Sequence, residues 1–200
     1  GGIFERSAKS ITLTPQIKKC FGISKSQLTP NELIKIILTA KVELLWFGGI
    51  GTYIKASTEV DADAGDRAND PVRINANQLN CQVIGEGANL GVTQRARIEF
   101  GLLKGRLNTD SVDNSAGVDC SDHEVNIKIL LNSVVAKGKL TQAQRNKLLA
   151  KMTGEVGDLV LRDNYLQTQA ITLVEAQDIE LLDHQTRFMR FLEREGRLDR

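Results

Sequence analysis

The chain has 200 residues, of which 26 are basic and 25 acidic, and its formal net charge at pH 7 is +1. This length allows one medium domain with a core of its own, or one such domain with a helical appendage. Scattered basic residues and an aromatic content of 4% give no case for nucleic-acid binding, and no apolar run approaches the ~20 residues that a membrane helix needs.

The first predicted elements are an irregular segment and a helix. We expect residues 1–22 to form a solvated connection. The N-terminus lacks the charged and apolar regions of a signal peptide, so we expect a soluble protein. The chain begins with Gly rather than Met, which favours a piece of a longer polypeptide. The motif T-P-N-E at residues 29–32 predicts a helix start, because Pro suits the first turn and an apolar run from Leu33 to Leu38 follows.

A short apolar run then predicts a buried parallel strand. Residues 42–47 read V-E-L-L-W-F and lead into the turn G-G-I-G at residues 48–51. The glycines either permit this turn or allow a ligand to lie against the backbone. A phosphate-cradling loop is disfavoured, because the turn matches neither the G-x-G-x-x-G pattern nor the Lys-bearing P-loop.

Residues 57–80 are polar and rich in carboxylates, among them Asp61, Asp63, Asp66 and Asp70. Several carboxylates in one run can attract a cation. The spacing lacks the regular series and distal Glu of an EF-hand, so a solvated excursion without a metal is the favoured interpretation.

A second strand and helix are predicted over residues 81–105. The run C-Q-V-I-G-E-G-A-N ends in small residues, and Asn89 brings both a donor and an acceptor to the strand end. Thr93 and Gln94 then begin a helix, which Lys104 and Gly105 end.

The stretch from Asp113 to Glu124, D-N-S-A-G-V-D-C-S-D-H-E, has the order of a third strand end, turn and helix start. We expect Asp119 or Ser121 to cap a helix whose first turn contains carboxylates that suit its positive end. Such a junction is either only well capped or also a ligand site, because ligands bind where strand carboxyl ends and helix amino ends converge.

Three successive strand, turn and helix units predict a parallel sheet with right-handed crossovers. The predicted fold class is therefore α/β, a partial doubly wound (Rossmann-like) parallel sheet with a C-terminal helical extension. We expect residues 1–140 to form the partial nucleotide-binding domain and residues 141–200 the helical segment. Within that segment, helices are predicted from Thr141 to Leu149, over about 155–174 and over about 178–194.

Cys20, Cys81 and Cys120 are odd in number and far apart, with neither a CxxC pair nor His at metal-ligand spacing. No disulfide framework or structural metal is predicted. A reducing, cytoplasmic compartment fits this pattern best.

Four blocks of the sequence resemble glutamate dehydrogenases. V-I-G-E-G-A-N-L-G-V-T at residues 83–93 resembles their A-E-G-A-N-x-P-T-T strand end, and N-S-A-G-V-D-C-S-D-H-E at residues 114–124 aligns without a gap on N-A-G-G-V-x-x-S-Y-F-E. W-F-G-G-I-G-T-Y-I-K-A-S and G-D-R-A-N-D look still more like the large NAD-specific bacterial glutamate dehydrogenases. The resemblance runs from residue 1 to about residue 165.

The resemblance implies where the cofactor NAD would lie. Gly48 and Gly49 would lie where the family's cofactor-domain loop passes the dinucleotide. Asn89 would lie beside the nicotinamide ribose, with Gly87 and Ala88 leaving room for it.

The resemblance also implies a substrate side. Asn114 would bond the nicotinamide carboxamide or a substrate group, Val118 would flank the bound amino acid, and Ser121 would donate to the side-chain carboxylate of glutamate. Asp122 and His123 replace the aromatic pair of the smaller enzymes, and local acid–base chemistry by these two residues is a minor alternative.

The family's cofactor-binding glycine loop and its catalytic Lys and Asp match nothing in this chain. We therefore expect no catalytic residue here, and the fragment alone should be inactive. The resemblance implies a parent enzyme, expected to be a homo-oligomer, that converts L-glutamate to 2-oxoglutarate and ammonia by hydride transfer to NAD, with the remainder of the same polypeptide as its partner. The alternative is a non-catalytic nucleotide-binding or assembly module of the same fold.

Overall fold

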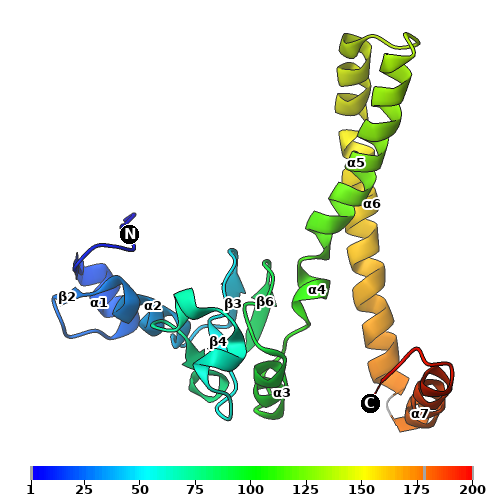
Figure 1. Cartoon of the computed structure of the whole chain (residues 1–200). Coiled ribbons are helices and arrows are strands. Elements are labelled where there is room, and N and C mark those ends of the chain that lie inside the picture. The colour runs from blue at the N-terminus through cyan, green and yellow to red at the C-terminus, as the bar shows by residue number, and fades with distance from the viewer. Residues whose placement is uncertain (1, 178, 200) are drawn as a thin grey trace. The chain divides into compact units, whose positions relative to one another are not determined.

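The structure is a computed structural model that describes residues 2–177 and 179–199. The chain forms two compact units, Gly1–Ser115 and Ala116–Arg200 (Figure 1). The predicted division at residue 140 falls within the second unit, at the loop between two of its helices. It remains a prediction about how a longer chain is divided into domains.

Residues 2–10 form no helix or strand, but a strand and a helix lie between residues 11 and 21, so the expected irregular connection over residues 1–22 is wrong from residue 11 onward. Strand β1 pairs antiparallel with β2, and a helix follows each strand. Thr14 caps the first helix, and Thr29 forms a capping box with Glu32 on the second, as the T-P-N-E motif predicts. The elements are β1 (Ile11–Thr12), α1 (Pro15–Phe21), β2 (Gln27–Leu28) and α2 (Pro30–Leu38).

The two predicted parallel strands are present and adjacent. They are β3 (Leu44–Phe47) and β6 (Val83–Glu86), which pair in parallel with Phe47 opposite Glu86. A second parallel pair joins β4 (Ile54–Lys55) to β5 (Ile74–Asn75). The α/β class is confirmed.

The predicted third strand is reduced to a single bridge. Arg106 lies beside Val83, with the Ile84 amide donating to the Arg106 carbonyl at 2.9 Å and the Arg106 amide donating to the Gln82 carbonyl at 3.0 Å. The chain then turns into α4 (Asp110–Asp113) instead of continuing as a strand. Across residues 2–177 and 179–199 the sheets are two-stranded, so a continuous doubly wound sheet remains a prediction.

The main core of the first unit lies between these strands and helix α3 (Gln94–Leu102), which Thr93 caps as predicted. Ile54 and Ile84 are fully buried, and each such side chain contributes roughly 1.5–3 kcal/mol of hydrophobic stabilisation. Ala96 and Phe100, one helical turn apart, present the buried face of α3 to the strands.

The acidic run at residues 57–80 is folded around a buried arginine, which the sequence did not predict. It contains three short 3₁₀ turns. The Arg73 guanidinium lies 3.2 Å from the Asp61 carboxylate, also pairs with Asp70, and donates to the Thr52 carbonyl at 2.9 Å. Burial acts to lower the pKa of Arg73, but hydrogen bonds to the two carboxylates outweigh it and raise the pKa. The carboxylates of Asp61 and Asp70 therefore stabilise the buried Arg73 guanidinium, and the run is not a simple solvated excursion.

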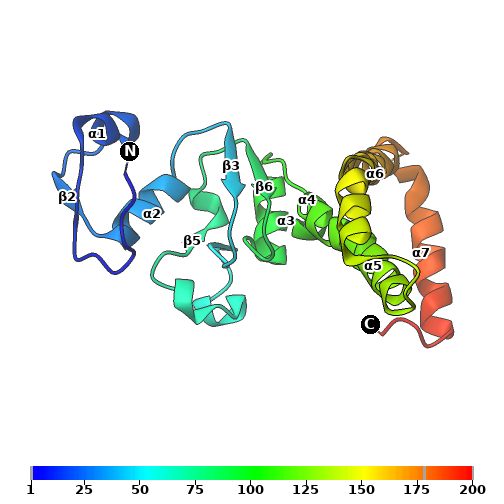
Figure 2. The same ribbon diagram turned by 90° about the horizontal axis from the view of Figure 1, so that it is seen from above.

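The described residues of the second unit form three helices, of which the first two, α5 and α6, lie side by side as a hairpin (Figure 2). Thr141 forms a capping box with Gln144 at the start of α6, as predicted. The two segments expected between Thr141 and Val174 are one continuous helix, because Gly154 and Gly157 lower its stability without breaking it. Asp178, the expected first residue of the last helix, lies outside the described residues. The helices are α5 (Ser115–Ala136), α6 (Gln142–Gln177) and α7 (Ile179–Arg194).

A search of the described helices finds none that is long and apolar enough to cross a membrane. The three cysteines are free thiols.

Candidate cofactor and substrate site

The two glycine turns predicted from the sequence meet at one edge of the β3–β6 pair. Because Phe47 and Glu86 are paired at the strand ends, Gly48 and Gly87 both follow at the carboxyl edge. Gly48 and Gly49 are exposed, and a methyl group added at Gly49 would meet nothing within 4 Å. The backbone of this turn is therefore open to a ligand.

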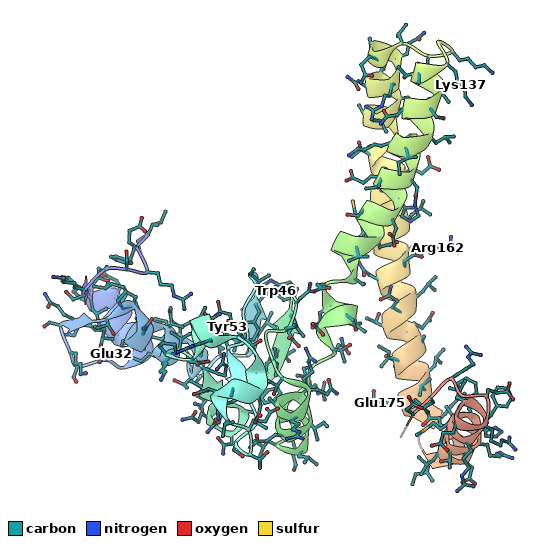
Figure 3. The ribbon with its side chains drawn as sticks, viewed as in Figure 1. Glu32, Trp46, Tyr53, Lys137, Arg162 and Glu175 are labelled. Carbon is teal, nitrogen blue, oxygen red and sulfur yellow. The ribbon has the colours of Figure 1, made fainter. Side chains whose placement is uncertain are left out.

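Trp46 gives Gly87 a role that the sequence interpretation missed. Trp46 lies on β3, next to β6 (Figure 3). Its indole packs against β6, since an added Cβ at Gly85 or at Gly87 would lie only 2.4 Å from the ring. Both glycines are needed for this close approach. The room beside Gly87 is thus occupied by Trp46, while the neighbouring Ala88 is buried.

Asn89 and Asn114 lie in direct side-chain contact, although they are 25 residues apart in the sequence. In one orientation of its amide, Asn114 also accepts from the Asn89 backbone N–H at 3.2 Å and donates to the Asp110 carbonyl at 3.1 Å. Asn89 is exposed and Asn114 half-buried. The pair therefore presents amide donors and acceptors at the carboxyl edge of the strands.

Helix α4 fixes this pair through two carboxylates, which accept hydrogen bonds from a backbone amide at the end of β6 and from one in the turn that follows. Asp113 accepts from the Glu86 amide at 2.9 Å, and its other oxygen accepts from Asn108 at 3.1 Å. Asp110 accepts from the Leu90 amide at 2.8 Å. These bonds lock α4 against the Asn89 turn, and none of the carboxylates was identified from the sequence.

A buried ion pair between Glu86 and Arg97 lies next to the same turn. Glu86 is fully buried, and its carboxylate accepts from Arg97 Nε at 2.9 Å and Nη2 at 3.0 Å. The Arg97 Nη2 atom also lies 3.0 Å from Asp110 Oδ1. One signal in the sequence could have indicated this pairing. Glu86 ends a buried strand and Arg97 lies in the helix that follows, and charged side chains in buried elements are normally paired.

Val118 and Ser121 belong to the second unit, on helix α5. This helix begins at Ser115, so the prediction that Asp119 or Ser121 caps it is wrong. Ser121 lies in the second turn of the helix, away from the N-terminal amides, and it is exposed, as is Val118. The helix dipole at the first turn therefore gives no special support to the anion-binding role expected of Ser121.

The partner of His123 is Asp119, one helical turn away at 3.5 Å. Asp163 of α6 completes a cluster whose ligand atoms all lie within 4.8 Å of one another. Asp122 instead accepts from the Asn126 side chain through its carbonyl. The sequence-based alternative of a local Asp122–His123 acid–base pair therefore finds no support in these contacts.

Parallel strands whose carboxyl ends close in glycine turns, with helices following them, place the chain among the α/β proteins. Residues 1–174 match the family model described as bacterial NAD-glutamate dehydrogenase, catalytic domain, and the chain belongs to this family.

Three curated proteins with similar sequences are all named NAD-specific glutamate dehydrogenase. The chain is 58% identical over 200 residues to the NAD-specific glutamate dehydrogenase of Halomonas elongata and 57% identical over 200 residues to that of Pseudomonas aeruginosa. It is 54% identical over 188 residues, 91% of the chain, to that of Mycobacterium tuberculosis. The first two alignments cover the whole chain, which spans 12% of the length of each of the three relatives.

Proposed function

We propose that the chain is part of an NAD-dependent glutamate dehydrogenase, in which it binds the nicotinamide side of the cofactor and one end of the substrate. The whole enzyme oxidises L-glutamate to 2-oxoglutarate and ammonia. The contact between Asn89 and Asn114 carries this proposal, because the family resemblance assigns Asn89 to the nicotinamide ribose and Asn114 to the nicotinamide carboxamide or a substrate group.

NAD, when bound, supplies the hydride acceptor. On this chain, the exposed amide of Asn89 can hydrogen-bond ribose hydroxyls, and Asn114 can orient a carboxamide that lies beside it. Gly48 and Gly49 leave their backbone open to the dinucleotide. Gly87 fits the proposal only in part, because the indole of Trp46 fills the space next to it.

The substrate end is assigned to Val118 and Ser121. Val118 offers an exposed apolar side chain and Ser121 an exposed hydroxyl donor on the same helix. A hydroxyl that donates to the side-chain carboxylate of glutamate favours this substrate over apolar amino acids, which lack an acceptor there.

The remainder of the polypeptide completes the doubly wound sheet in this proposal. The outer face of the β3–β6 pair is apolar and exposed, with Leu44, Trp46 and Val83 all on the surface. Parallel strands are normally covered on both faces, so this face is suited to packing against further structure. The catalytic Lys and Asp also come from that remainder, so the isolated fragment is inactive. The proposal includes a cytoplasmic location, which the cysteine pattern supports, and homo-oligomeric assembly, which the family resemblance supports.

The test measures NAD-linked glutamate oxidation by the full-length protein. We expect Asn89→Ala to raise the KM for NAD and Ser121→Ala to raise the KM for glutamate, each by about tenfold, which corresponds to the loss of one hydrogen bond to a polar or charged group. Ser133→Ala, an exposed serine farther along α5, is the matched control and should leave both constants unchanged.

The two assignments fail separately. If Ser121→Ala behaves like Ser133→Ala, the substrate role of Ser121 is wrong although the enzyme assignment stands. If the wild-type protein does not reduce NAD in the presence of glutamate, the dehydrogenase assignment fails, and the alternative of a non-catalytic nucleotide-binding or assembly module takes its place.

A further inference from the structure

Arg97 lies on helix α3, nearly buried, at the centre of the hydrogen bonds that shape the Asn89 turn. Its guanidinium uses all three nitrogens: Nε and Nη2 donate to Glu86, Nη2 also bonds Asp110, and Nη1 donates to Gln94 at 3.1 Å. Removing a charge from water is costly, and a neutral apolar side chain could fill the same volume. The arrangement therefore calls for a reason beyond stability.

Each carboxylate paired with Arg97 also holds a backbone N–H of the turn. Glu86 Oε1 accepts from the Val92 amide at 3.0 Å, and Asp110 Oδ2 accepts from the Leu90 amide at 2.8 Å. Leu90 has a φ of 58°, a left-handed conformation that a branched side chain rarely adopts. One of these amides belongs to the strained residue Leu90 itself and the other to Val92, two residues later, so the carboxylates that Arg97 orients determine the path of the chain next to Asn89.

The same arginine fixes the other half of the amide pair. Asp110 begins α4, and its carbonyl accepts from the Asn114 backbone N–H at 2.9 Å. The carboxylate of that residue is held by Arg97. The guanidinium thereby links the turn of Asn89 to the helix end of Asn114.

We infer that Arg97 is a positioning residue of the cofactor site, which sets the separation and orientation of Asn89 and Asn114 without contacting NAD. The inference rests on the proposed function and deepens it. A shift of either amide would leave the nicotinamide ring bound but tilted away from the substrate α-carbon, and small errors of this kind lower rates strongly.

The test uses the full-length enzyme with Arg97→Lys, Asp110→Asn and the control Arg95→Lys. Lysine keeps the positive charge of Arg97 but cannot bond two carboxylates as a planar fork. Asp110→Asn keeps an oxygen for the Leu90 amide but turns a donor or a neutral acceptor toward Arg97. Arg95 is exposed on the same helix, so Arg95→Lys should behave as wild type.

We expect kcat to fall about tenfold or more in Arg97→Lys and Asp110→Asn, with a smaller rise in the KM for NAD and an unchanged KM for glutamate. The primary isotope effect measured with 2-deutero-glutamate should increase, because a poorly aligned ring makes hydride transfer more rate-limiting. A merely structural defect would reduce the amount of active enzyme and leave the isotope effect and both KM values unchanged.

The outcomes separate the inference from the proposed function. Equal kinetics and equal isotope effects in Arg97→Lys and Arg95→Lys, with an active wild type, overturn the positioning role alone. A fall in active-enzyme amount only, or loss of folded protein in both network variants, makes Arg97 a folding residue and also overturns it. A wild type that does not oxidise glutamate overturns the proposed function together with this inference.

Discussion

The two compact units of this chain differ in how their side chains are supported. In the first unit, strand ends, turns and α4 are tied together by buried charges and by an apolar core that includes Ile54 and Ile84. In the second unit, Val160 is the only buried apolar side chain among the residues described there, and many apolar side chains of its helices are exposed. The proposed cofactor residues are thus held in place, whereas the proposed substrate residues lie on the surface of a helix.

This difference indicates which of the two proposed groups of residues is held in place by the chain alone. Asn89 and Asn114 contact each other through a network that needs nothing from outside the first unit. Val118 and Ser121 depend on whatever covers α5 in the complete protein, because an exposed apolar helix face is stabilised by packing and not by its own propensity. The following predictions test the contrast with matched substitutions in the two units.

The largest effect is expected from shortening a core side chain of the first unit. Ile84→Ala leaves a cavity at a position with 1% exposure, and we expect it to lower the free energy of unfolding by about 2–5 kcal/mol. Ile129→Ala on α5, at 62% exposure, should change it by less than about 0.5 kcal/mol. Urea unfolding of the full-length protein, monitored by the hydrogen exchange of β6 and α5, measures the change in stability for both variants.

A large loss in Ile129→Ala would show that the rest of the protein covers this face of α5. The contrast between the units would then hold for the chain alone and not for the enzyme.

A smaller effect is expected where Trp46 crosses the strand end. Gly87→Ala places a methyl group against the indole, and such overpacking costs about 1–3 kcal/mol of stability. Gly49→Ala, which has open space around it, is the control. In the double variant Gly87→Ala with Trp46→Ala, the penalty of the glycine substitution should be smaller than in the single variant, as thermal unfolding of the full-length protein would show.

The NAD affinities of the single variant Gly87→Ala and of the double variant separate the two roles of Gly87. If removal of the indole restores stability but not NAD affinity, the glycine is needed for the cofactor as well as for Trp46. If Gly87→Ala is neutral even with Trp46 present, the close packing at this strand end is wrong.

The smallest effect concerns the polar groups of the first unit. Hydrogen bonds from Asn69 and from the Thr52 amide hold the pKa of Asp66 below its usual value. A carboxylate with a lowered pKa contributes stability that is fully present above its unfolded pKa and is lost as the pH falls through the folded pKa. Asp66→Asn should therefore cost on the order of 1 kcal/mol at neutral pH and progressively less in acid.

The exposed pair Glu124 and Lys128 on α5 gives the comparison from the second unit. Glu124→Gln should have almost no effect at any pH, because surface pairs one helical turn apart contribute little. Stability measured from pH 7 down to about pH 3 would test both variants. A difference between wild type and Asp66→Asn that stays constant over this range would contradict the role assigned to the Asp66 carboxylate.

Local signals in the sequence determined several elements of this protein. The apolar runs that end at Phe47 and at Glu86, each followed by a glycine, predicted both parallel strands. Thr29, Thr93 and Thr141 predicted three helix starts. These signals succeed because a cap or a buried strand depends on residues within a few positions of each other. Family resemblance added the candidate residues of the site but not their arrangement.

Tertiary structure alone decided the rest. The contact of Asn89 with Asn114, the indole over Gly87, and the carboxylates of Glu86 and Asp110 that pair with Arg97 all join residues at least 11 positions apart, and no local pattern encodes which charges will be buried together. The prediction of a third strand was wrong because strand formation also depends on a partner distant in sequence. Leu107 and Val112 have the composition of a strand, but a strand forms only where a neighbouring strand satisfies its backbone, and here Arg106 alone pairs before α4 begins.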